Sequence, residues 1–188
     1  MWKVVKWTLA GQVTPFFKLS DAAAPLLDGD EPPEQFFATL RDAGADDDAM
    51  QFLCYALPRR VAIAWGRDCV GRTAGPANLT PADVAAYSAV GAWLDDPSDE
   101  RRWVAHDAAL AAEFRSAEAI LAVAVYTSGG SLALPHCPQP CPPPPELSGQ
   151  MVAGALAAAA TRAEAGQIAA AKAAFLDRGT LFASGEVR

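Results

Sequence analysis

Residues 80–98, TPADVAAYSAVGAWLDDPS, indicate the fold more clearly than any other stretch of the chain. Thr80 suits the N-cap of a helix, Pro81 suits the first helical position, and Asp83 stands where a capping box carries an acid. Larger apolar residues then recur at spacings of three and four: Val84, Tyr87, Val90 and Leu94. The stretch therefore predicts an amphipathic helix that ends before the Asp-Pro-Ser break at 96–98.

Similar start and stop signals divide most of the chain into helices. Pro33 and Pro58 stand where helices can begin, and Ser98 can cap another. We expect further helices at about 33–44, 47–57, 58–71, 98–114 and 116–125, and two more that begin near 148 and near 164–167. The last two helices have faces built mostly of alanine, so they must pack closely against other helices.

The composition also favours helices. Alanine fills 42 of the 188 positions, whereas isoleucine fills three. Alanine loses no side-chain entropy in a helix, and β-branched residues lose some. A chain of this length is typical of one domain and can bury a core without disulfides or metal ions. We expect an all-α fold, a compact bundle of seven or eight helices, in which residues 20–188 form a single helical domain.

The first 19 residues show a different pattern. Lysines and apolar residues alternate between Trp2 and Leu9, and a period of two indicates a short strand or an extended arm. Each of the two faces carries an aromatic ring and a lysine, so neither face is cleanly apolar. We expect residues 1–19 to form a short extended N-terminal arm.

Residues 133–146 form a proline-rich segment. Seven of the eleven residues from Pro135 to Pro145 are proline, a density that excludes a helix and favours extended backbone. The segment is either a linker between domains or a strap on the surface of one domain. Because the two helices after it need close packing partners, we expect a strap that returns the chain to the bundle.

Charge and hydropathy exclude several classes of protein. The net charge of −7 weighs against nucleic-acid binding, which needs clustered lysines and arginines. Lysines interrupt the apolar N-terminus, which argues against a secretory signal, and no apolar stretch reaches the ~20 residues of a membrane span. We expect a cytoplasmic protein without membrane insertion, in which Cys54 and Cys69 are buried as small apolar residues.

Eight carboxylates lie between residues 28 and 48, where Arg41 is the single basic residue. Acids favour the first turn of a helix, where the helix dipole is positive, and Asp46, Asp47 and Asp48 directly precede an apolar helical pattern. We interpret this acidic segment as solvated helix starts. A site for a metal or for a basic partner is the alternative.

Few residues point to catalysis. The chain has two histidines, His106 and His136, and the glycine turn at 128–131 lacks the lysine of a phosphate-binding loop. His136, Cys137 and Cys141 are residue types that bind zinc, but structural zinc needs four ligands, and proline-rich backbone spreads neighbouring side chains. We predict no catalytic residue, no cofactor and no metal site. A small metal-binding protein or enzyme that uses these three residues remains an alternative.

The most basic stretch surrounds Arg59 and Arg60. Arg67 follows Arg60 by seven residues, which places both on nearly one helix face, and Trp65 lies in the same helix. Arginine and tryptophan are over-represented where binding energy concentrates at protein interfaces. Three interpretations are open: ion pairs between Arg59 or Arg60 and the acidic segment 28–48, a patch for a protein partner, or a site for a small anion.

Several stretches together resemble an uncharacterised bacterial family, an all-helical domain of unknown function found in type VI secretion gene neighbourhoods. The stretches are 56–60 (ALPRR) with Trp65, 92–100 (AWLDDPSDE), 128–132 (SGGSL), 147–149 (LSG) and 175–179 (FLDRG). Together they span most of the chain from about residue 20 onward. The resemblance leads us to expect a second aromatic residue beside Trp65, where this chain has Ala64.

The resemblance implies a setting but no activity. We expect a non-enzymatic accessory protein of type VI secretion, an adaptor or chaperone-like protein that docks a secretion component or an effector. The partner surface would comprise Arg59, Arg60, Trp65, Arg67 and Trp93. An immunity protein whose acidic face binds a basic toxin domain is a further alternative.

Overall fold

The computed structural model describes residues 1–75, 79–134 and 136–187. These residues form the α-helices α1 to α8 and three short 3-10 helices, η1 to η3, and they contain no strand. The α-helices are α1 (Pro33–Asp42), α2 (Asp46–Ala56), α3 (Arg59–Thr73), α4 (Pro81–Asp95), α5 (Asp99–Ala111), α6 (Ala117–Tyr126), α7 (Leu147–Ala160) and α8 (Ile168–Ser184). The predicted all-α class is confirmed.

Three helices begin at the caps that the sequence indicates. The Thr80 side chain accepts a hydrogen bond from the Asp83 backbone at 3.2 Å, and the Asp83 carboxylate accepts the Thr80 N–H in return, which completes a capping box. Ser98 and Ser116 cap α5 and α6 with their side chains, which accept hydrogen bonds from the N–H groups of Arg101 and Ala119 without a reciprocal bond. The helix predicted at about 58–71 runs to Thr73, and Gly75 and Pro76, which suit a helix stop, follow its C-cap Ala74; Pro76 lies outside the described residues.

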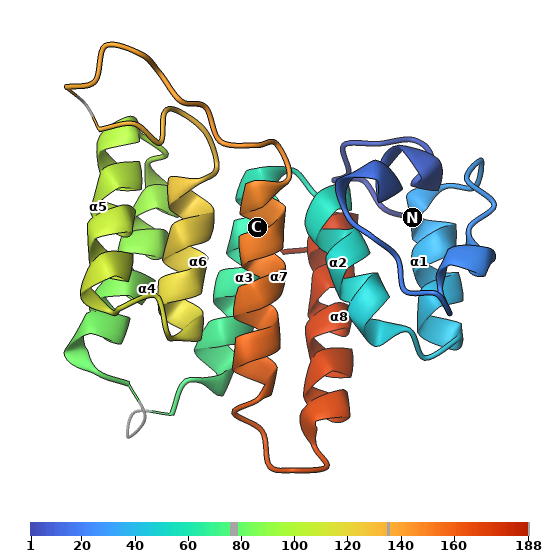
Figure 1. The fold of residues 1–188 in the computed structure, drawn as a ribbon. Coiled ribbons are helices and arrows are strands. Elements are labelled where there is room, and N and C mark those ends of the chain that lie inside the picture. Colours follow the sequence, from blue (N-terminus) through green and yellow to red (C-terminus); the bar gives the residue numbers. More distant parts are fainter. Residues whose placement is uncertain (76–78, 135, 188) are drawn as a thin grey trace.

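The helices stand side by side in a bundle (Figure 1). One side consists of α4, α5 and α6, the middle of α3 and α7, and the other side of α8, α2 and α1. The contact between α6 and α7 is the most extensive in the molecule. Both helices carry fully buried alanines, namely Ala122, Ala124, Ala155, Ala159 and Ala160.

Glycines permit the closest approaches between helices. A Cβ atom at Gly179 of α8 would lie 2.3 Å from the Cδ2 atom of Leu53 and 2.9 Å from the Cε2 atom of Trp65. Trp65 is fully buried, and its ring N–H donates a hydrogen bond of 2.8 Å to the Phe175 carbonyl of α8. These contacts hold α2, α3 and α8 together around one tryptophan.

A buried ion pair connects the beginning of α6 to the end of α7. The Glu118 carboxylate is fully buried and accepts two hydrogen bonds from the Arg162 guanidinium, at 2.9 and 2.5 Å. Such a bidentate pair satisfies both carboxylate oxygens at a place where water cannot.

Of the two forms considered for the N-terminal segment, a short strand or an extended arm, the described residues contain no strand. Residues 1–9 form no regular element, and the 3-10 helices η1 (Ala10–Gln12), η2 (Thr14–Phe16) and η3 (Ala24–Leu26) follow. The N–H groups of Lys3 and Val4 donate to the Ala183 carbonyl of α8, and the N–H of Lys6 donates to the Ala56 carbonyl of α2. The alternating residues therefore bind two helix ends, so no neighbouring strand is needed to satisfy them.

Aromatic rings fix the same segment to α2. The rings of Phe16 and Phe17 stack on Tyr55, with centroids 6.2 and 5.5 Å apart, and the Trp7 ring N–H donates to the Tyr55 carbonyl at 3.2 Å. Residues 1–19 thus cover one side of the helical domain and contribute Ala10 and Val13 to its core.

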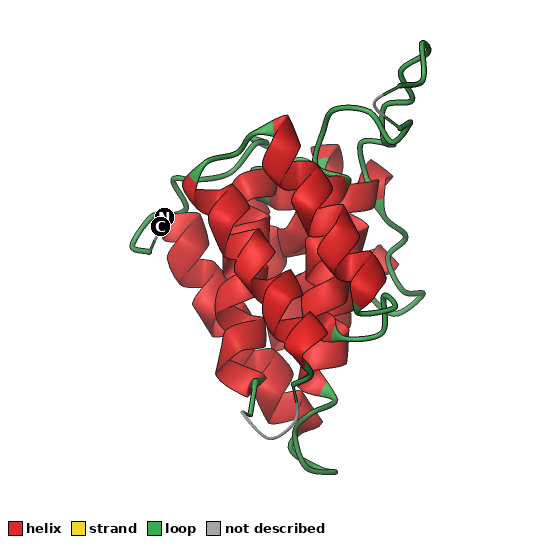
Figure 2. Ribbon diagram, turned by 90° about the vertical axis from the view of Figure 1, so that its left-hand side faces the viewer, coloured by secondary structure: helices red, strands yellow, loops and turns green. Residues whose placement is uncertain are grey.

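The proline-rich segment returns the chain to the bundle, as predicted, because α7 and α8 pack against the other helices. Its tip is not laid on the surface, however, and projects away from the helices (Figure 2). The Leu132 N–H donates to the Cys141 carbonyl, and the Cys141 N–H donates to the Ser131 hydroxyl, so the loop is closed at its base. Pro135 lies outside the described residues.

Two arginines secure the base of this loop. Arg102 is buried and donates to the Tyr126 and Ser131 carbonyls, both at 2.8 Å. Arg59 donates to the Ser128 carbonyl at 3.0 Å and to the Pro145 carbonyl at 3.2 Å, and thereby connects the turn after α6 to the end of the proline-rich segment. In the turn between Ser128 and Ser131, Gly130 has a φ of 64°, a left-handed conformation that favours glycine.

We predict that Gly179→Ala destabilises the protein by about 1–3 kcal/mol, because the added methyl group overpacks the contact with Leu53 and Trp65. Urea unfolding measures the change. Gly154→Ala is the matched control, since a Cβ there meets only the Ile120 Cγ2 atom at an ordinary 3.5 Å. Equal stabilities of the two variants would contradict the packing described.

We predict that Arg162→Met destabilises the protein by about 3–5 kcal/mol, because it leaves the Glu118 carboxylate buried without a partner. Arg115→Met, which breaks an exposed pair with Glu113, is expected to cost less than about 1 kcal/mol. Adding Glu118→Leu to Arg162→Met should restore most of the lost stability. A double variant as unstable as Arg162→Met would show that the charge is not the cause.

Candidate functional site

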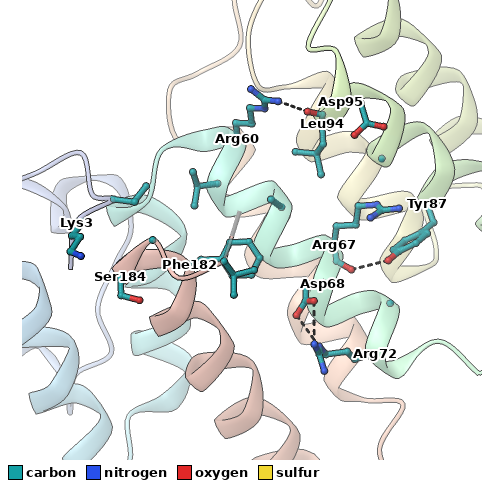
Figure 3. Close-up of a pocket in the computed structure, with 17 residues that line it drawn as sticks. Lys3, Arg60, Arg67, Asp68, Arg72, Tyr87, Leu94, Asp95, Phe182 and Ser184 are labelled. Carbon is teal, nitrogen blue, oxygen red and sulfur yellow. Dashed lines mark hydrogen bonds and ion pairs between the residues drawn. The ribbon is translucent and has the colours of Figure 1, made fainter. Parts of the chain in front are cut away.

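A groove of about 1120 Å³ runs along α3 (Figure 3). The floor is α3 from Arg60 to Arg72, and α4 forms one wall. The other wall consists of the end of α8, the C-terminal residues after it, and Lys3 and Val4 of the N-terminal segment. A helix rises 1.5 Å per residue, so the floor is roughly 18 Å long.

The floor of the groove is a single stripe of α3. Arg60, Ala64, Arg67 and Gly71 follow one another at spacings of four, three and four, which places them on one helix face. Arginine therefore alternates with a small residue along the floor. The predicted common face of Arg60 and Arg67 is confirmed, since both line the same groove.

Arg67 and Tyr87 occupy the centre of the groove. The guanidinium carbon of Arg67 lies 4.4 Å from the centroid of the Tyr87 ring, and the Tyr87 hydroxyl donates to the Arg67 carbonyl at 3.2 Å (Figure 3). A cation over an aromatic ring is attracted to the ring face. The two side chains thus hold each other in place across α3 and α4.

Two glycines leave the space that these side chains fill. A Cβ atom at Gly91 of α4 would lie 2.8 Å from an Nη atom of Arg67, and one at Gly71 of α3 would lie 2.3 Å from the Tyr87 hydroxyl oxygen. Each helix therefore lacks a side chain where the other helix places a large one. This reciprocal fit shows that the arrangement of Arg67 and Tyr87 depends on both glycines.

Asp68 is the acidic partner of two arginines at the edge of the groove. Its carboxylate accepts hydrogen bonds from Arg72 and from Arg178 of α8, each at 2.8 Å. Partial burial by itself would raise the pKa of Asp68, but the bonds from Arg72 and Arg178 hold the pKa below its ordinary value of 3.8. Asp68 is therefore ionised at neutral pH and connects α3 to α8.

The predicted ion pairs between Arg59 or Arg60 and the acidic segment 28–48 are wrong. Both arginines lie at the start of α3 and bind backbone carbonyls: Arg59 those of Ser128 and Pro145, and Arg60 that of Leu94 in α4. Two acids of the acidic segment pair with other basic residues. The Oδ1 atom of Asp46 lies 3.4 Å from the Nε atom of Arg41, and the Oδ1 atom of Asp47 lies 2.6 Å from the Nζ atom of Lys172.

Trp65 and Trp93, predicted as parts of a partner surface, are not surface residues. Trp65 is fully buried in the core, and Trp93 is 7% exposed. Both rings are large apolar groups on the inner faces of their helices, where burial removes them from water. Of the five residues predicted for the partner surface, the groove contains Arg60 and Arg67.

The residues weighed for a zinc site do not form one. His136, Cys137 and Cys141 are exposed on the proline-rich loop, and in the described part of the chain no three His, Cys, Asp or Glu side chains gather as around a metal ion. Cys54 and Cys69 are buried free thiols, as predicted, and burial raises the pKa of both. None of the described helices is long and apolar enough to cross a membrane.

Comparison with known proteins gives a family. Residues 36–183 match the model of a family of unknown function, DUF6931. The match includes most of α1, all of α2 to α7 and nearly all of α8. The chain belongs to this family. No curated protein and no solved structure matches the chain significantly. The DUF6931 region contains α3 and α4, and therefore the floor and one wall of the groove.

Tyr87, Gly71 and Gly91 are groove residues that the sequence reasoning missed. The sequence signal was present, because Gly71 continues the four-and-three spacing of Arg60, Ala64 and Arg67. Gly91 lies in the middle of a predicted helix, where glycine costs about 1 kcal/mol relative to alanine and so indicates a close approach. Only the structure shows that the close neighbour is an arginine.

We predict that Asp68→Asn lowers stability at neutral pH by about 1 kcal/mol, because the partly exposed carboxylate no longer binds Arg72 and Arg178. Since the folded-state pKa is lowered, the carboxylate stabilises the protein fully above its unfolded pKa, and this contribution is lost as the pH falls through the folded pKa. The stability difference between wild type and variant should therefore shrink below about pH 4. Urea unfolding from pH 7 to pH 3 measures it, and a constant difference would contradict the assignment.

Proposed function

We propose that this DUF6931 protein is a non-enzymatic docking protein, an adaptor or chaperone-like accessory of bacterial type VI secretion that works in the cytoplasm. Its partner docks in the groove along α3. The observation that carries the proposal is the centre of that groove, where Arg67 of α3 packs against Gly91 of α4 and Tyr87 of α4 packs against Gly71 of α3.

The shape of the groove supports docking of a chain segment. An extended chain advances about 3.3 Å per residue, so a floor of roughly 18 Å accommodates five or six residues. Ala64 is a small residue on the floor and leaves room for backbone to approach, whereas the spaces at Gly71 and Gly91 are filled by Tyr87 and Arg67. Val61 and Phe182 add apolar surface, which stabilises a bound chain by burial.

The charge of the groove differs from that of the whole protein. Four basic side chains line it, namely Lys3, Arg60, Arg67 and Arg72, against two acidic ones, Asp68 and Asp95, whereas the chain carries a net charge of −7. Asp68 is engaged by Arg72 and Arg178. Charge complementarity therefore favours an acidic partner at the groove and disfavours one elsewhere on the surface.

The secretion setting rests on the resemblance of the sequence. Two of the stretches that carry it, 56–60 and 92–100, meet at one end of the groove, where Arg60 donates to the Leu94 carbonyl. The described residues of the groove lining include no histidine and no cysteine, which favours binding over catalysis. A role as immunity protein would use the acidic segment 28–48 in place of the groove.

Site-specific photo-crosslinking in the native bacterium tests the proposal. A benzoylphenylalanine residue replaces Ala64 on the groove floor or, as the control, Val104, which is 52% exposed on α5 outside the groove. A third position, Asp30 in the acidic segment, tests the immunity alternative. Mass spectrometry identifies the proteins crosslinked at each position.

We expect the Ala64 position to capture a type VI secretion component or an effector that the Val104 position does not capture. Adding Arg60→Glu and Arg67→Glu should remove that crosslink, because the charge of the groove is reversed. A toxin captured at Asp30 would show that the protein is an immunity protein, and the proposed docking in the groove would be rejected. The same proteins at Ala64 and Val104, or none at Ala64, would overturn the proposal.

A further inference from the structure

We propose that the groove binds an acidic peptide segment of the partner protein through one carboxylate that Arg67 receives in a bidentate pair. This inference rests on the proposed docking function and specifies its chemistry. Arg67 would then be the residue that selects the partner, and Tyr87, Gly71 and Gly91 would be the residues that position it.

The first observation is an unsatisfied donor. The Nε–H group of Arg67 is buried and has no hydrogen-bond acceptor among the described residues. A buried polar group without a partner costs about 1–3 kcal/mol, and more when it is charged, so native structures retain few of them. Arg67 also lines the open groove, which gives an incoming acceptor access to the guanidinium. The Nε–H group itself is closed off beside Gly91, so a ligand in the groove is expected to bind the guanidinium through its Nη groups.

The second observation is that Arg67 is held ready for a ligand. Its guanidinium lies over the Tyr87 ring and fills the space above Gly91, where a methyl group would displace it. A planar guanidinium fixed in this way presents its donors at a constant angle, which matches the two oxygens of a carboxylate. Little side-chain entropy is then lost on binding.

The neighbouring charges favour a carboxylate over a phosphate. Arg72 is engaged by Asp68, and Arg60 already donates to the Leu94 carbonyl. Arg67 alone among these three has a buried donor without a partner. Asp68 and Asp95 also line the groove, and their charges repel a dianion more strongly than a group of charge −1.

The walls of the groove favour a peptide over a small acid. Apolar side chains line it on both sides of Arg67, with Val61 and Phe182 toward α8 and Leu94 toward α4. A small dicarboxylic acid leaves these surfaces exposed to water, whereas the side chains beside an Asp or Glu in a peptide cover them. The expected ligand is thus an extended segment with one acidic residue between apolar ones.

Peptide selection with the purified 188-residue protein tests the inference. A phage library of random dodecapeptides is selected on wild type, on Arg67→Met, and on Arg115→Met, which removes an exposed arginine outside the groove. Peptides from wild type and Arg115→Met should share an Asp or Glu at one position, and those from Arg67→Met should lack this preference. No enrichment by wild type, or the same acidic preference with Arg67→Met, would overturn the inference.

Affinities measured by fluorescence anisotropy show how much the contact between Arg67 and the carboxylate contributes to peptide binding. Replacing the shared acid of the best wild-type peptide by its amide should weaken binding at least about tenfold, and Arg67→Met should weaken binding of the acidic peptide equally. Arg67→Lys keeps the charge but loses the paired donors of the guanidinium. Its affinity for the acidic peptide should therefore lie between those of wild type and Arg67→Met. Succinate or inorganic phosphate that binds as tightly as the peptide would overturn the assignment to a peptide.

Gly91→Ala provides a second variant that leaves Arg67 in place. The added methyl group displaces the guanidinium, so this variant should also lose the acidic preference, while thermal unfolding shows that the bundle remains folded. Full retention of the preference would overturn the role given to Gly91 and Arg67. Crosslinking of a partner at Ala64 that persists after Arg67→Met would leave docking intact and reject only the carboxylate contact.

Discussion

Close approach between helices is the constraint on which the rest of the structure depends. Glycines lie at several helix contacts, and a methyl group added at Gly179 or Gly91 would collide with a neighbouring side chain. In the core, this closeness surrounds Trp65 with α2, α3 and α8. Between α3 and α4, it lets Arg67 and Tyr87 cross from one helix to the other. The same property of the sequence thus produces both the stability of the bundle and the shape of the groove.

Local signals in the sequence predict the helices well. The capping box at Thr80, the serine caps and the prolines at helix starts act within a few residues, so they can be recognised without knowledge of the fold. The N-terminal segment shows the limit of such reasoning. Its alternation resembles a strand, but whether Lys3 and Val4 bond to a strand or to the end of α8 depends on tertiary contacts.

The site is predictable only in part for the same reason. The spacing of Arg60 and Arg67 places both on one face of a helix, and the structure confirms that face as the groove floor. Which residues face the solvent is not a local property, and so the buried Trp65 and Trp93 could not be separated from exposed aromatics by sequence alone. The partners of Arg59 could not be predicted either, because they are backbone carbonyls 69 and 86 residues away.

The closed base of the proline-rich loop has a consequence for variation among relatives. Hydrogen bonds between Leu132 and Cys141, and from Arg59 to Ser128 and Pro145, fix where the chain leaves α6 and where it enters α7. The residues at the tip carry none of these bonds. Evolution can therefore lengthen, shorten or replace the tip without shifting either helix, which makes it the natural place for insertions.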